Sequence, residues 1–152
     1  MAYLDLNGFK ARTLMPAAEV DSIESFAAGW ILQQLTDGSA YLDTRLAKRY
    51  EAPFTSPYPI AILKWLTQLV TVRVYFKRGV NPSDEQFALV QKDAETAEAE
   101  IKEAADSDAG LFDLPLRSDT NASGIVKGGP FSYSEQSPWT WTDVQLEAVG
   151  NE

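Results

Sequence analysis

The 152-residue chain contains neither cysteine nor histidine. Without cysteine it has no disulfide and no thiolate metal site, which agrees with a cytosolic product. Without histidine it lacks the usual proton shuttle near neutral pH, the commonest metal ligand and any nucleophile paired with an imidazole base. No glycine-rich phosphate loop is present either, because the GGP at 128–130 is not followed by lysine and a helix. We therefore expect no cofactor.

Long apolar runs are also missing. The start, MAYLDLNGFK, has no basic region followed by an apolar stretch, and IAILKWLTQLVTVRVYF is interrupted by Lys64, Gln68 and Arg73. A membrane-spanning helix needs roughly 18 or more apolar residues in succession. We expect neither secretion nor membrane insertion, and a single core at this length.

Acidic residues outnumber basic ones, and they are concentrated in the second half. Residues 1–80 hold 9 basic and 7 acidic side chains, whereas residues 81–152 hold 4 and 15, within a net charge of −9. The basic pairs Lys48–Arg49 and Lys77–Arg78 fall where helices are predicted to end, which the helix dipole favours without any ligand. An acidic surface repels phosphate, so we expect no tight nucleic-acid binding.

The hydrophobic pattern predicts an all-α fold, a small antiparallel bundle of about four helices over residues 1–106. One helix begins at Pro16. A second is predicted to be continuous from about 26 to 50, with Asp37-Gly38 tolerated inside it at a cost of about 1 kcal/mol. Residues 60–78 are too long for a strand and predict a buried central helix.

A further helix is predicted after Gly79, with Asn81 as its N-cap and Pro82 in its first turn. A narrow apolar stripe follows at spacings of three and four: Phe87, Val90, Ala94, Ala97, Ile101 and Ala104. The opposite side carries Glu95, Glu98, Glu100 and Glu103. These glutamates are expected on an acidic face that is either solvated or lines a shared cavity.

The stretch LAKRYEAPFTSPYP, residues 46–59, holds three prolines. Proline fixes its own backbone angle and pushes the residue before it out of helical geometry, so the helix must stop here. We predict a rigid elbow that turns one core helix back onto another. Phe54 and Tyr58 either cover that junction or contact a neighbouring molecule.

Residues 107–152 lose helical periodicity and predict an extended, irregular C-terminal arm, with a short β-hairpin at 125–133 as one form. The arm nevertheless carries the large aromatic residues Phe131, Tyr133, Trp139 and Trp141. One buried tryptophan covers roughly 150–250 Å², which is several kcal/mol at roughly 25 cal/mol/Å². The arm is therefore expected to dock, on its own core or on another chain.

Carboxylate pairs can catalyse hydrolysis without histidine, and Glu95 with Glu98 or Asp106 with Asp108 would be such pairs. A catalytic pair needs burial to separate the acidities of its two carboxyls, whereas these are predicted to be exposed. The DSDAG at 106–110 imitates the opening of a calcium loop, but Arg117 stands where its last ligand belongs. We expect no enzyme and no metal.

The stretch GSAYLDTRLAKRYEAPFTSPYPIAILKWLTQLVTVRVYFKRGVNPSDEQF resembles the small phage head-completion, or head-to-tail connector adaptor, proteins of the Mu-like type. The shared order is a helix ending in Leu-x-x-Arg-Tyr, a proline-containing turn, a hydrophobic helix ending in tyrosine and a basic residue, and a charged helix. The resemblance covers residues 16 to about 105 and is carried by Ala40, Leu42, Leu46, Arg49, Tyr50, Pro53, Pro59, Tyr75, Arg78 and Gly79.

The resemblance implies a non-enzymatic virion protein, made in the host cytoplasm and placed in the neck of the particle. Such proteins form a homo-oligomeric ring, usually a dodecamer, between the portal protein and the stopper or tail-completion proteins. The ring lets genomic DNA pass without binding it specifically, and the four glutamates would face its lumen. Two other hypotheses remain open: a free-standing helical interaction module whose tryptophan-rich tail recognises a protein, and a carboxylate-dependent hydrolase.

Overall fold

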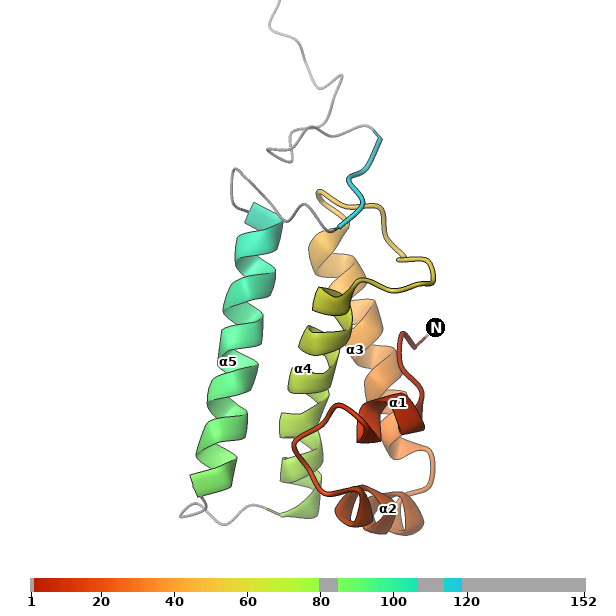
Figure 1. The fold of residues 1–152 in the computed structure, drawn as a ribbon, viewed down its shortest axis with the longest axis vertical. Coiled ribbons are helices and arrows are strands. Elements are labelled where there is room, and N and C mark those ends of the chain that lie inside the picture. Colours follow the sequence, from red (N-terminus) through yellow and green to blue (C-terminus); the bar gives the residue numbers. More distant parts are fainter. Residues whose placement is uncertain (1, 80–84, 107–113, 119–152) are drawn as a thin grey trace, which may run out of the picture.

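The computed structural model describes residues 2–79, 85–106 and 114–118. Every regular element within these ranges is an α-helix: α1 (Leu6–Lys10), α2 (Ala17–Phe26), α3 (Trp30–Leu46), α4 (Ile60–Arg78) and α5 (Glu85–Asp106). Figure 1 shows α3, α4 and α5 as three long neighbouring rods, with the short α1 and α2 against one end. The predicted all-α bundle is confirmed.

The three long helices run in alternating directions and enclose one core. α4 supplies most of its bulk, as the predicted central helix. Its fully buried side chains include Ile62, Trp65, Leu66 and Val70, which meet Ile31, Leu35, Leu42 and Leu46 of α3. The predicted stripe of α5 is buried from Val90 to Ala104, while Phe87 is half-buried. Because most of that stripe is alanine, α5 can approach α4 closely.

The predicted continuous helix from 26 to 50 is wrong at both ends. α2 ends at Phe26 and α3 begins at Trp30, because Gly29 adopts the left-handed region at φ 77° that favours glycine. α3 ends at Leu46 rather than at residue 50. The prediction that Asp37-Gly38 lies inside a helix is confirmed. A Cβ on Gly38 would come within 2.7 Å of Leu66 Cδ1, so glycine lets α3 and α4 approach.

The proline elbow, residues 47–59, also closes the end of α5. The Arg49 guanidinium donates a hydrogen bond of 2.9 Å to the Ala104 carbonyl oxygen, and the Tyr50 hydroxyl donates one of 3.0 Å to the same atom. Both side chains are fully buried. The last carbonyls of a helix lack intrahelical donors and favour a cation. The elbow therefore caps a helix more than fifty residues further along the chain.

The start of the chain is fixed to the same elbow through Tyr3. Its hydroxyl donates to Asp43 and accepts from the Phe54 amide at 3.0 Å, and its own amide donates to Ser39 Oγ at 3.1 Å. Burial, with the Asp43 hydrogen bond, raises the pKa of Tyr3 well above its usual range. The hydroxyl thus remains a donor throughout the physiological pH range.

Phe54 and Tyr58 both pack at the junction of the elbow, whereas contact of Tyr58 with a neighbouring molecule stays a prediction. Phe54 is 5% exposed and its ring meets Tyr3 edge-on, 6.0 Å between centroids. Tyr58 is half-buried with its ring 4.9 Å from that of Tyr3. Both cover the junction of the elbow, as predicted. Phe54 has no free surface for a neighbouring molecule.

The core continues beyond the predicted boundary at residue 106, because residues 114–118 pack on the elbow. Leu114 is buried in the core cluster. The Glu51 amide donates to the Pro115 carbonyl at 2.8 Å and the Arg117 amide to the Arg49 carbonyl at 3.0 Å. These residues of the predicted arm therefore dock on their own chain. The hairpin predicted at 125–133 lies outside the described residues.

Leu114→Ala in the full chain is expected to lower the free energy of unfolding by about 2–4 kcal/mol, because it empties a buried site. Leu116→Ala is the matched control. Leu116 is 42% exposed, so its truncation should cost less than about 1 kcal/mol. Urea unfolding followed by circular dichroism measures both. Equal losses would mean that residues 114–118 are not anchored through Leu114.

Candidate interaction groove between α3 and α5

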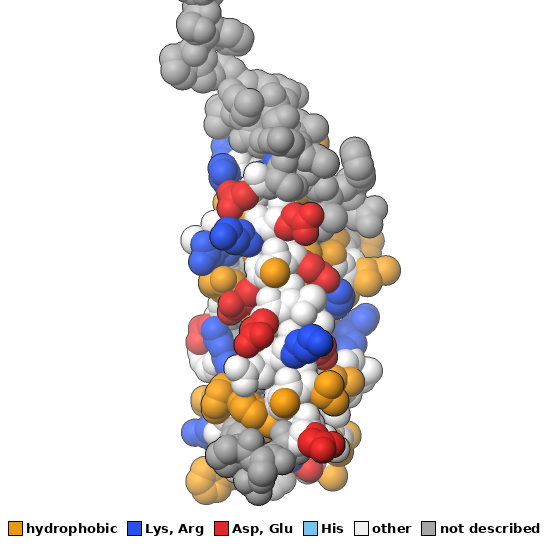
Figure 2. Space-filling model, turned by 90° about the vertical axis from the view of Figure 1, so that its left-hand side faces the viewer, with side chains coloured by type: hydrophobic (Ala, Val, Ile, Leu, Met, Phe, Trp, Pro, Cys, Tyr) orange, Lys and Arg blue, Asp and Glu red, His pale blue; other side chains and the backbone are white. Residues whose placement is uncertain are grey.

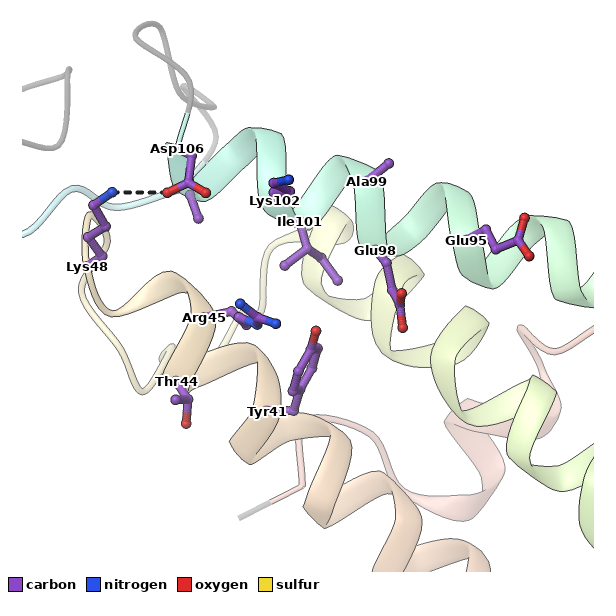
Figure 3. A pocket seen from close by; sticks show the side chains of 11 residues that line it. Tyr41, Thr44, Arg45, Lys48, Glu95, Glu98, Ala99, Ile101, Lys102 and Asp106 are labelled. Carbon is purple, nitrogen blue, oxygen red and sulfur yellow. Dashed lines mark hydrogen bonds and ion pairs between the residues drawn. The ribbon is translucent and has the colours of Figure 1, made fainter.

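A groove of about 800 Å³ separates the outer sides of α3 and α5 near the elbow. Ile101 and Ala105 of α5 form its apolar floor. The walls are Tyr41, Thr44, Arg45 and Lys48 from α3 and Glu95, Glu98, Ala99, Lys102 and Asp106 from α5. Figure 3 shows the Tyr41 ring, the Arg45 guanidinium and the Glu98 carboxylate directed into the space between the two helices.

Charges of both signs line the groove at close spacing. The Arg45 guanidinium lies over the Tyr41 ring, 5.5 Å from its centroid. Lys48 Nζ bonds to Asp106 Oδ1 at 3.0 Å across one end, and this bond holds the pKa of Asp106 below its usual range. Both partners are exposed, so the pair adds little to stability. Alternating charge suits a polar protein surface better than phosphate or a metal.

The four glutamates predicted to share one acidic face point in different directions. Glu95 and Glu98 line the groove toward α3. Glu100 faces α4 instead, where Trp65 Nε1 donates to it at 2.6 Å and Lys64 Nζ at 3.0 Å. Glu103 is exposed. With 3.6 residues per turn, residues two or five positions apart point to different sides of the helix, as Glu98 and Glu100 do.

The outer side of α5 is consequently a surface of mixed charge. Lys92 and Lys102 stand among the carboxylates, and Figure 2 shows basic and acidic side chains interleaved along this side. The described residues hold 12 basic and 14 acidic side chains, a net −2, which leaves 1 and 8 for the remainder. Of the 15 acidic side chains of residues 81–152, 7 are on α5 and 8 lie outside the described residues.

The remaining candidate contact residues of the sequence, Phe131, Tyr133, Trp139 and Trp141, lie outside the described residues. Sequence reasoning missed Tyr41, Arg45 and Lys102 of the groove. Their signal was present: Tyr41 and Arg45 are four residues apart, as are Glu98 and Lys102. Residues at that spacing share one side of a helix.

Among the described residues, no three carboxylates lie close enough together to hold a metal ion. None of the helices in those ranges combines the length and the hydropathy needed to cross a membrane. Comparison of the chain with protein-family models, curated proteins and solved structures gives no match. The groove must therefore be interpreted from its own chemistry.

Glu100→Gln is expected to weaken the dependence of stability on acid pH. The hydrogen bond from Trp65 is the main cause that holds the pKa of Glu100 below its ordinary value. The carboxylate therefore stabilises the fold above that ordinary value, and the contribution is lost as pH falls through the lowered pKa. Urea unfolding between about pH 7 and pH 3 should show the difference from wild type shrinking with acidification.

The matched control for this series is Glu103→Gln, which neutralises an exposed carboxylate of the same helix. The free energy of unfolding of this control should stay close to that of wild type from about pH 7 to pH 3. A Glu100→Gln difference that is constant with pH would contradict the coupling of Glu100 to Trp65.

Proposed function

We propose that the protein is a structural adaptor of a phage particle, a head-to-tail connector that forms a ring between the portal and the tail machinery. The observation that carries this proposal is the role of the residues behind the resemblance. Leu46, Arg49 and Tyr50 are fully buried, and the last two cap α5. The motif thus builds a specific joint of the fold. The connector function itself comes from the resemblance of this motif, by analogy.

The groove supplies a surface suited to ring assembly. Neighbouring subunits in a ring meet through two different surfaces, one on each partner. Arg45, Lys48 and Lys102 alternate with carboxylates along the groove, so a partner must match both signs in register. Such complementarity favours specificity over raw affinity. We assign the groove to contact with the next subunit, which suits a protein that stays separate until assembly begins.

The charge of the bundle is compatible with a conduit for DNA. A net charge of −2 over the described residues, with cations dispersed, offers phosphate no continuous basic track. The exposed Glu103 and its neighbours on the outer side of α5 are the candidates for a surface facing the lumen. In this arrangement the adaptor is located in the neck, with the portal on one side and stopper or tail proteins on the other.

Deleting the gene from the phage genome that encodes the chain is expected to leave DNA-filled heads and separate tails. The double substitution Arg45→Glu with Lys102→Glu should reproduce that defect, because it removes the positive charges from the middle of the groove. Lys92→Glu, an exposed reversal elsewhere on α5, should give normal particles. Electron microscopy of lysates measures particle type, and circular dichroism confirms that each variant folds.

Tailed, infectious particles from the deleted genome would contradict the adaptor function and favour the free-standing interaction module. If the deleted genome gives no tailed particles but the double variant assembles normally, only the assignment of the groove would be contradicted.

A further inference from the structure

A second hollow, this one apolar, lies at the end of the bundle away from the elbow. It is about 190 Å³ in volume and is lined by Leu14, Tyr75, Gln86, Leu89 and Val90. Leu14 is 66% and Leu89 is 62% exposed, although they flank the same depression. Single exposed leucines are ordinary, but two around one hollow form a patch. Figure 2 shows hydrophobic side chains gathered near this end of α5.

The size of the hollow narrows the choice of occupant. Small-molecule pockets usually measure about 300–1,000 Å³, so a hollow of this volume suits a single side chain. The chain outside the described ranges contains large aromatic side chains, among them Trp139 and Trp141. Burying one such ring removes roughly 150–250 Å² from water. A ring of this size would fill the hollow and cover its two exposed leucines.

The chain is long enough for Trp139 and Trp141 to reach the hollow of the same molecule. Residue 118 lies beside the elbow, because Arg117 bonds to the Arg49 and Ala47 carbonyls. The hollow is at the other end of α4, whose 19 residues span about 28 Å. Trp139 follows Ser118 by 21 residues, which reach up to about 70 Å when extended. Closing a loop of this length costs little more than closing a shorter one.

Charge around the hollow is compatible with the same occupant. Residues 119–152 carry 5 acidic and 1 basic side chains. Arg12 lines the small adjoining depression, which also contains Asp93. On the other side the Arg78 guanidinium lies over the Tyr75 ring, 4.7 Å from its centroid, while also pairing with Glu19. Each arginine thus lies with a carboxylate, so the charge beside the hollow is balanced and does not repel a segment whose own charge is negative.

We propose that the Trp139–Trp141 segment docks in the hollow between Leu14 and Leu89 of its own chain. The C-terminal segment is then a strap that runs from the elbow to the opposite end of α4 and α5. An intramolecular segment competes at an effective concentration near millimolar, which favours docking in cis over capture by a neighbour. The proposal is independent of the adaptor function.

The absence of cysteine provides a direct test. A single cysteine is introduced by Gln86→Cys or, in a separate variant, by Asp93→Cys, and is labelled with bimane. Tryptophan quenches bimane fluorescence on contact. In the full chain, Trp139→Phe with Trp141→Phe should raise the fluorescence severalfold, because phenylalanine keeps the apolar ring but does not quench. The rise should be independent of protein concentration. The control Trp30→Phe, which replaces a tryptophan of α3, should leave the bimane fluorescence unchanged.

Leu89→Asp should also relieve the quenching at both label positions by displacing the strap. Ile60→Asp is its control, because Ile60 is 80% exposed at the other end of α4. Equal fluorescence with and without Trp139 and Trp141 at both positions would overturn the proposal. Quenching that disappears on dilution would overturn docking in cis and assign the hollow to a second copy.

Discussion

One carbonyl oxygen, that of Ala104 in the last turn of α5, is the point on which the arrangement of the bundle depends. A buried helix end must find donors for carbonyls that its own backbone leaves unpaired. Here they come from Arg49 and Tyr50, which lie next to each other in the proline elbow. The prolines of the elbow end the helix beyond Tyr50, whose amide still donates to the Leu46 carbonyl at 2.9 Å. The joint thus ties the end of α5 to the segment that follows α3, beside the groove.

The same joint divides the molecule into two unlike ends. At the elbow end, Tyr3 ties the start of the chain to Asp43 and Phe54, and residues 114–118 cover Tyr50. At the other end, Leu14 and Leu89 remain exposed around an apolar hollow. The described residues thus combine a hydrogen-bonded end, a polar groove along the side and an apolar hollow at the far end. Of these features, the groove is the surface that the proposed adaptor function uses.

Local signals predicted most of the fold from the sequence. Pro59 and Gly79 delimit α4 at residues 60 and 78, because proline and glycine act on the backbone where they stand. The break at Gly29 was missed, since the sequence alone does not say which glycine takes a positive φ. Arg49 was interpreted as a helix-end cation, because nothing local indicates a contact with Ala104, 55 residues away. Likewise, counting carboxylates could not reveal that Glu100 turns toward Trp65.

Hydrogen exchange of the α5 amides tests the central claim most directly. Replacing Arg49 by methionine and Tyr50 by phenylalanine leaves side chains of similar length in the elbow but removes both donors to the Ala104 carbonyl. The account predicts that the last two turns of α5 lose protection while the middle of α4 keeps it, because the cap is local and the core is intact. Unchanged protection at the end of α5 would contradict it, since the joint would then be maintained by packing alone.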